Sequence, residues 1–145
     1  MPRRHLLLVC LASALVSLPT SANEKPPEEY VKAMQSMAAA AKGLEKAIHD
    51  ADPVTMDKYV IIARSAIGVV EKYWANREVE DAIELAAAAS KSISEISVAQ
   101  YLMSSGPHPP AREGAEMALR DLVATCAACH LAHREALPDG SYRIR

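Results

Sequence analysis

The sequence predicts an all-α protein, folded as an antiparallel up-down four-helix bundle. Its apolar residues recur at helical spacing in four segments of similar length, and no run of useful length alternates apolar and polar residues as a strand would. Alanine supplies much of the 50% hydrophobic content, aromatic residues make up only 4%, and Phe is absent. This composition favours closely packed helices over sheets. At 145 residues the chain has the length of one domain.

The N-terminal segment has the three parts of an export signal. The basic start MPRRH precedes the apolar run LLLVCLASALVSL, and small residues at Thr20 and Ala22 precede the expected cleavage point. The apolar run is short for a membrane span, and Cys10 lies inside it and is expected to leave with the signal. We therefore expect a cleaved signal peptide over 1–22, a single mature domain over 23–145 and a periplasmic location.

Cleavage would leave an acidic chain. It removes two arginines and no acid, so 14 Lys and Arg remain against 18 Asp and Glu, a net charge of −4. Phosphate backbones require a basic face, so this balance argues against nucleic acid as a partner. In the periplasm, the two remaining cysteines could form a disulfide, a redox site, a metal site or a covalent attachment point.

The first two helices are predicted over 30–49 and from Pro53 to about 74. The apolar stripe of the first is formed by Val31, Met34, Met37 or Ala38, Ala41, Leu44 and Ile48. The turn HDADP ends it, and Asp52 followed by Pro53 is a suitable cap and first turn for the second helix. The apolar face of the second helix comprises Met56, Tyr59, Val60, Ala63, Ile67, Val70 and Trp74.

The third and fourth helices are predicted over about 79–103 and 111–136. The third has an apolar face through Ile83, Ala86, Ser90, Ile93 and Ser97, and the stretch SSGPHPP stops it. The fourth carries Ala115, Ala118, Leu122, Thr125 and Cys126, and PDGSYRIR is expected to be a turn and a tail. Short connections make sequential helices antiparallel neighbours, and the first and last helices are then adjacent too.

Cys126, Cys129 and His130 form a C-x-x-C-H motif within the fourth predicted helix. Spacings of three and four residues place all three on one side, continuous with the apolar stripe. C-x-x-C-H is the attachment motif of c-type haem, in which two thiols add to the haem vinyl groups and the histidine binds the iron. The sequence therefore predicts one covalently attached haem c.

Other uses of the motif fit less well. A redox C-x-x-C usually opens a helix after a strand, whereas this one lies deep in a predicted helix. A structural zinc site needs about four ligands. Only His49, His108 and His133 remain as candidates, at unconvincing spacings, and we expect all three to be exposed to solvent. A simple disulfide would not account for the adjacent histidine.

A haem iron has a second axial position, which the facing first helix could fill. That helix offers Met34 and Met37. Methionine on an apolar helix face usually fills the core. With a haem between the first and last helices, however, a thioether ligand becomes plausible, as in Met/His-ligated haems.

With these features the chain resembles the cytochrome c′ superfamily of single-haem, four-helix-bundle c-type cytochromes, over about 28–145. CAACHLAHR is similar to the family's C-x-x-C-H-x-x-x-R, which implies that His130 is the proximal ligand and that Arg134 packs near it. MQSMAAAAKGL is similar to a first-helix stretch of the low-spin members, which implies that Met34 is the distal ligand and Met37 a packing residue. Many members have an arginine near the haem propionates where this chain has Tyr30, whose hydroxyl could serve instead.

The coordination of the iron decides the expected function. With Met34 and His130 both bound, no position is open, and one-electron transfer between periplasmic redox proteins is the chemistry that remains. Without Met34, small neighbours such as Ala38 and Ala41 would leave room for NO or CO, as in the high-spin relatives. A haem-free helical interaction protein is a third alternative.

No catalytic set is apparent, so we do not expect an enzyme. Many members of the family are homodimers, and the sequence does not decide whether this chain forms one.

Overall fold

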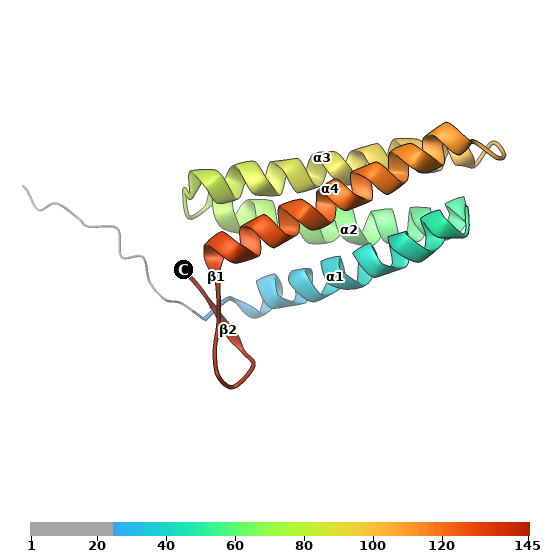
Figure 1. Cartoon of the computed structure of the whole chain (residues 1–145). Helices are drawn as coiled ribbons and strands as arrows, with labels where there is room; N and C mark the ends of the chain where they lie inside the picture. The colour runs from blue at the N-terminus through green and yellow to red at the C-terminus, as the bar shows by residue number, and fades with distance from the viewer. Residues whose placement is uncertain (1–24) are drawn as a thin grey trace, which may run out of the picture.

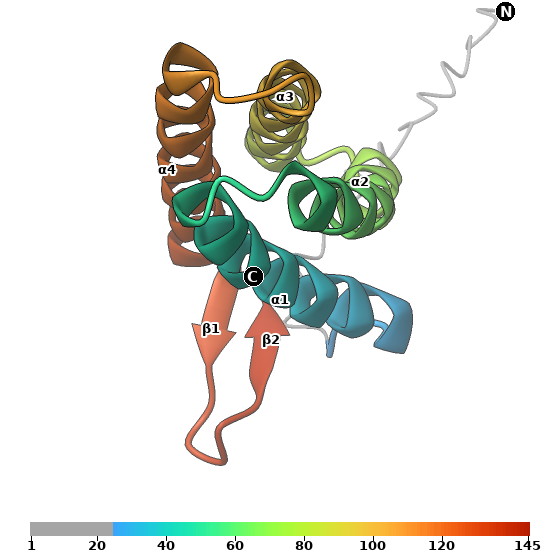
Figure 2. The same ribbon diagram turned by 90° about the vertical axis from the view of Figure 1, so that its right-hand side faces the viewer.

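The computed structural model describes residues 25–145, so the predicted signal peptide over 1–22 lies outside the described residues. Within the described part, four helices follow one another: α1 (Glu28–His49), α2 (Pro53–Ala75), α3 (Glu80–Met103) and α4 (Pro109–His133). Sequential helices pack side by side in antiparallel order, and α1 also contacts α4 (Figures 1 and 2). The predicted up-down four-helix bundle is therefore confirmed.

Side-chain caps fix where two of the helices begin. Asp52 Oδ1 accepts hydrogen bonds from the backbone N–H groups of Val54 and Thr55, at 3.1 and 3.0 Å, as the predicted cap of α2 should. His108 Nδ1 accepts one from the N–H of Ala111 at 3.1 Å. The His108 cap and the prolines after it start α4 two residues before the predicted position.

Met37, Leu44 and Ile48 of the predicted stripe of α1 are buried, but the rest of its buried face is displaced by one residue from that stripe. The core takes Tyr30, Ala33, Met37, Ala40, Leu44, Ala47 and Ile48. The neighbouring stripe of Val31, Met34, Ala38 and Ala41 lines cavities between α1 and α4 instead. The first helix thus carries two adjacent apolar stripes, and the bundle core uses only one of them.

The predicted face of α3 is also partly wrong. Ile83 is 37% exposed, and the core takes the adjacent row of Ala82, Ala86, Ala89, Ile93, Ile96, Ala99 and Met103. Alanines let α3 approach its neighbours closely, so the larger Ile83 side chain is left at the margin.

No helix in the region 25–145 has an apolar stretch long enough to cross a membrane.

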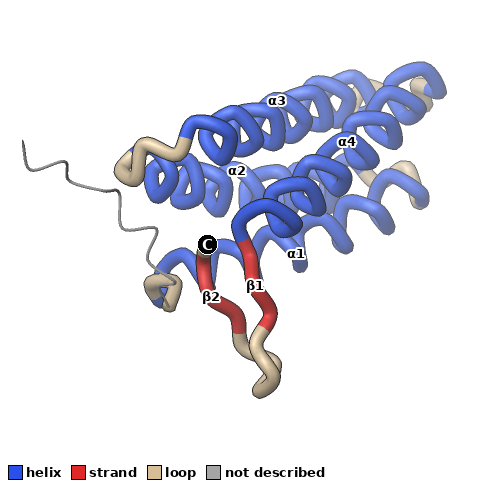
Figure 3. Tube along the Cα trace, turned by 60° about the vertical axis from the view of Figure 1, so that its left-hand side comes forward, coloured by secondary structure: helices blue, strands red, loops and turns tan. Residues whose placement is uncertain are grey.

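The predicted C-terminal turn is present, but the residues around it pair as a β-hairpin rather than ending in a tail. Strands β1 (Arg134–Ala136) and β2 (Tyr142–Ile144) pair antiparallel directly after α4 (Figure 3). Gly140 closes the turn at φ 82°, and its N–H donates to the Leu137 carbonyl at 3.0 Å. The helix therefore ends at His133, three residues before the predicted end. Ile144 is buried at 2% exposure and fixes the hairpin to the bundle.

Candidate functional site

Two cavities meet at the C-x-x-C-H motif. The larger, about 880 Å³, lies between the start of α1, the end of α4 and the hairpin. The smaller, about 230 Å³, lies inside the bundle. Met34 and Ala38 of α1 and Cys129 and His130 of α4 line both. The size of the larger cavity is in the range of small-molecule and cofactor sites, roughly 300–1,000 Å³, and the smaller cavity lies below that range.

The motif residues project from the C-terminal part of α4, as predicted. Cys126 and Cys129 are partly buried and His130 is more exposed. Cys126 lines the inner cavity, whereas Cys129 and His130 line both. Helical spacing therefore brings two thiols and one imidazole to a shared space beside α1.

Burial controls the protonation of these groups. It raises the pKa of the Cys126 thiol and raises that of Cys129 to about 11, where the nearby Cys126 and Asp81 add to the rise. Burial, and then the charge of Arg134, lower the pKa of His130. At neutral pH both thiols therefore carry their protons, and the imidazole is neutral, the form that can bind a metal.

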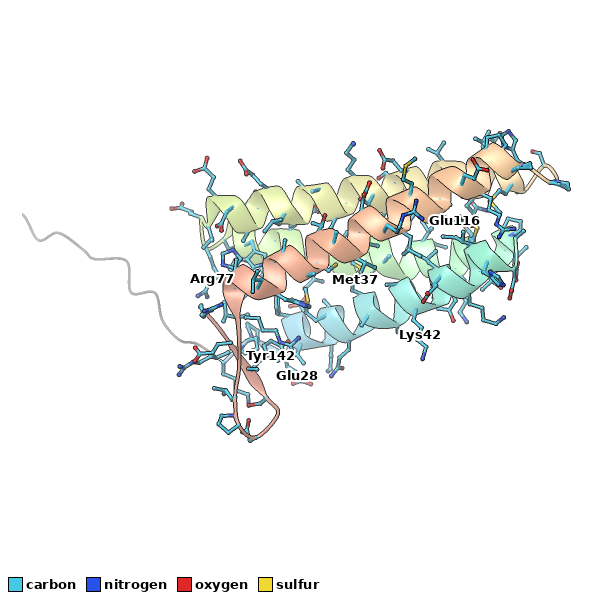
Figure 4. All side chains as sticks on the ribbon, viewed as in Figure 1. Glu28, Met37, Lys42, Arg77, Glu116 and Tyr142 are labelled. Atoms are coloured by element: carbon cyan, nitrogen blue, oxygen red, sulfur yellow. The ribbon has the colours of Figure 1, made fainter. Side chains whose placement is uncertain are left out.

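The two methionines of α1 occupy different environments. Met37 is 5% exposed and belongs to the core, in agreement with its predicted packing role (Figure 4). Met34 is only partly buried, and it borders the same two cavities as His130. The structure thus brings Met34 and His130 to one space from facing helices, and iron ligation by Met34 remains a prediction.

Tyr30 and Arg134 both reach the larger cavity, as the sequence suggested. Tyr30 is 4% exposed, and its ring centroid lies 4.3 Å from that of Tyr73 and 6.2 Å from that of Trp74. Burial is the main cause of the raised pKa of its hydroxyl. The Arg134 guanidinium lies over the ring of Tyr142, 4.3 Å from its centroid. An aromatic cluster therefore forms one wall of the cavity.

The prediction that His133 is exposed is wrong. Its ring is buried against Trp74, with centroids 4.9 Å apart, and its Nε2 lies 3.0 Å from Asp81 Oδ2. The position of His133 in the sequence indicates its burial. It follows Cys126 by seven residues and Cys129 by four, so it continues their stripe on the helix. The exposed positions predicted for His49 and His108 are confirmed.

The hairpin residues of the cavity were missed by the sequence reasoning. Its lining includes Leu137, Ser141, Tyr142, Arg143 and Ile144, from a segment expected to be a turn and a tail. The stretch PDGS predicted the turn, since Pro, Asp and Gly are typical turn residues, but it did not show that the residues on either side pair as strands.

The fold and this cavity define a four-helix bundle with a C-x-x-C-H motif facing the space between its first and last helices. Among residues 25–145, no group of three or more His, Cys, Asp and Glu side chains is arranged to hold a metal ion. Comparisons with models of protein families, with curated proteins and with solved structures found no match.

Proposed function

We propose that this protein is a periplasmic mono-haem c-type cytochrome of the cytochrome c′ superfamily that carries single electrons between redox proteins. One observation carries the proposal. Cys129 and His130 of the motif border the same two cavities as Met34 of the facing helix, and Cys126 borders the inner one. A covalent attachment site and two axial ligands would then surround one cofactor-sized space.

The residues present fit a haem c. The protonated thiols of Cys126 and Cys129 suit attachment, because each S–H adds across a vinyl C=C bond to form one C–S and one C–H bond, and no oxidant is needed. His130, neutral at pH 7, has a nitrogen lone pair to give to iron. The haem would supply a reversible one-electron change at its iron.

The inner cavity offers the apolar surroundings that such a group needs. Its walls include the buried side chains of Met37, Ile67, Val70 and Leu122. Beside apolar walls charges interact more strongly than in solution, so the protein could tune the potential of the iron. The role of the bundle would be to hold the ligands in place and keep water from them.

Binding of the iron by Met34 would distinguish an electron carrier from a gas-binding protein. With its thioether bound, the iron would have no open position. The alternative, a five-coordinate protein that binds or sequesters NO or CO, is favoured by one feature: the small side chains of Ala38 and Ala41 border the inner cavity beside Met34. These alanines would leave room for a diatomic ligand if Met34 did not bind.

Absorption spectra of protein matured in a haem-attaching host test the proposal. We expect a low-spin reduced spectrum with no response to CO in the wild type, and a high-spin spectrum with CO binding in Met34→Leu. Met37→Leu is the matched control, because Met37 is on the same helix and borders the inner cavity but lies in the core. A wild type that binds CO would favour the gas-binding protein, and no haem absorbance would contradict both.

A further inference from the structure

The part of the larger cavity lined by Tyr30, Trp74, Arg134 and Tyr142 forms its rim. Trp74 and Tyr142 both line it, and the indole N–H of the first and the hydroxyl of the second are buried without a hydrogen-bond partner among residues 25–145. Trp74 is 1% exposed, so water has little access to its N–H. Buried donors are nearly always satisfied in folded proteins, so two in one cavity point to a ligand that supplies acceptors.

Tyr30 extends this cluster. It lines the same cavity as Cys129, Trp74 and Tyr142. Its ring centroid lies 4.3 Å from that of Tyr73 and 6.2 Å from that of Trp74. The rim therefore gathers neutral donors from α1, α2 and the hairpin.

The hairpin holds Tyr142 firmly at this rim. The buried Ile144 anchors the second strand, and the N–H of Arg145 donates to the His133 carbonyl at 3.0 Å. Across the strands, the Arg143 guanidinium donates to both carboxylate oxygens of Glu135, at 2.8 and 2.9 Å. Figure 4 shows Tyr142 on the hairpin near the first turns of α1.

The charge at the rim favours an anion. Arg134 covers the face of the Tyr142 ring and borders the cavity, and Lys25 lies on the same border. The acid on that border, Asp139, accepts hydrogen bonds from the N–H and hydroxyl of Ser141, at 2.9 and 2.6 Å, within its own turn. Donors beside a guanidinium suit a carboxylate, which accepts hydrogen bonds without donating any.

We propose that Trp74, Tyr142 and Arg134 bind the two propionate groups of the haem, and that the C-terminal hairpin closes over them. This inference rests on the proposed function. A haem has an apolar edge and a carboxylate edge; the inner cavity suits the first and the rim suits the second. The hairpin is then part of the binding site and a barrier between the propionates and water.

The midpoint potential of the matured protein as a function of pH tests this assignment. An ionised propionate lowers the potential, and donors that stabilise its charge hold its pKa low. In Tyr142→Phe, which removes one donor and keeps the ring, we expect the inflection to move to higher pH by about one unit, a tenfold change in proton affinity. Tyr101→Phe is the control, because Tyr101 is 72% exposed on α3 and lies outside the cavity lining.

The outcomes separate the two proposals. If haem is attached but Tyr142→Phe titrates like Tyr101→Phe, the propionate assignment is wrong and the cytochrome proposal stands. If no haem is attached to the wild type, both fail. Resonance Raman spectra give a second readout, since the propionate bending band should shift in Tyr142→Phe and not in the control. A purely structural role for Tyr142 would leave that band unchanged.

Discussion

Replacement of Ile144 by Ala should open the hairpin without unfolding the bundle. Ile144 is 2% exposed, and it is the buried hydrophobic residue of the hairpin. Isoleucine-to-alanine changes in cores cost about 2–5 kcal/mol. We expect about 2–3 kcal/mol here, because a terminal hairpin can detach locally and leave no empty cavity in the bundle.

Hydrogen exchange of two hairpin amides measures this effect. The Arg145 N–H donates to the His133 carbonyl and the Leu137 N–H to the Ser141 carbonyl, so both are protected only while the hairpin is closed. A loss of about 2–3 kcal/mol predicts exchange roughly 30- to 150-fold faster at these sites. Helical amides in the core should keep their protection.

The control is Leu131→Ala, near the same end of α4. Leu131 is 80% exposed, so its truncation should leave exchange at both amides unchanged. Unaltered exchange in Ile144→Ala would show that Ile144 does not anchor the hairpin. Faster exchange throughout the helices would contradict the predicted local opening, since the hairpin and the bundle would then open together.

Two further perturbations test the packing around α1. A Cβ at Gly43 would lie 2.2 Å from Cζ of Tyr59, so Gly43→Ala should lower the free energy of unfolding in urea by about 1–2 kcal/mol despite the better helix propensity of alanine. The same change should be stabilising in a Tyr59→Ala background, and a more stable single variant would contradict the clash. Burial raises the pKa of Tyr30 above its ordinary 10.0, so its contribution to stability is complete below about pH 10 and is lost as pH rises further. The melting temperature of Tyr30→Phe should therefore fall less steeply above pH 10 than that of the wild type or of Tyr101→Phe; equal slopes would show that Tyr30 is not the cause.

The helices were predictable because their boundaries are chemically strong. The Asp52–Pro53 pair and the SSGPHPP stretch each stop one helix and start another, and both act locally. The core face of α1 was less predictable. Two apolar stripes lie side by side on that helix, and periodicity alone does not show which one meets the core and which one a cavity.

The candidate site was predictable where it depended on spacing. Residues three and four apart share a helix face, and short turns place α1 beside α4, so Met34 could be expected near His130. The burial of His133 and the contribution of Tyr142 were not foreseen. The first depends on Trp74 and Asp81 from other helices, and the second on strands of three residues, too short to show an alternating pattern.

The intact mass of denatured protein, purified from a haem-attaching host, shows whether a haem is covalently attached to the chain. We expect a chain that carries the mass of one haem, which remains bound through acid extraction. We also expect that replacement of both Cys126 and Cys129 by alanine removes this added mass. A wild-type chain with the mass of the polypeptide alone and two free thiols would show that no haem is attached and that the protein is not a c-type cytochrome.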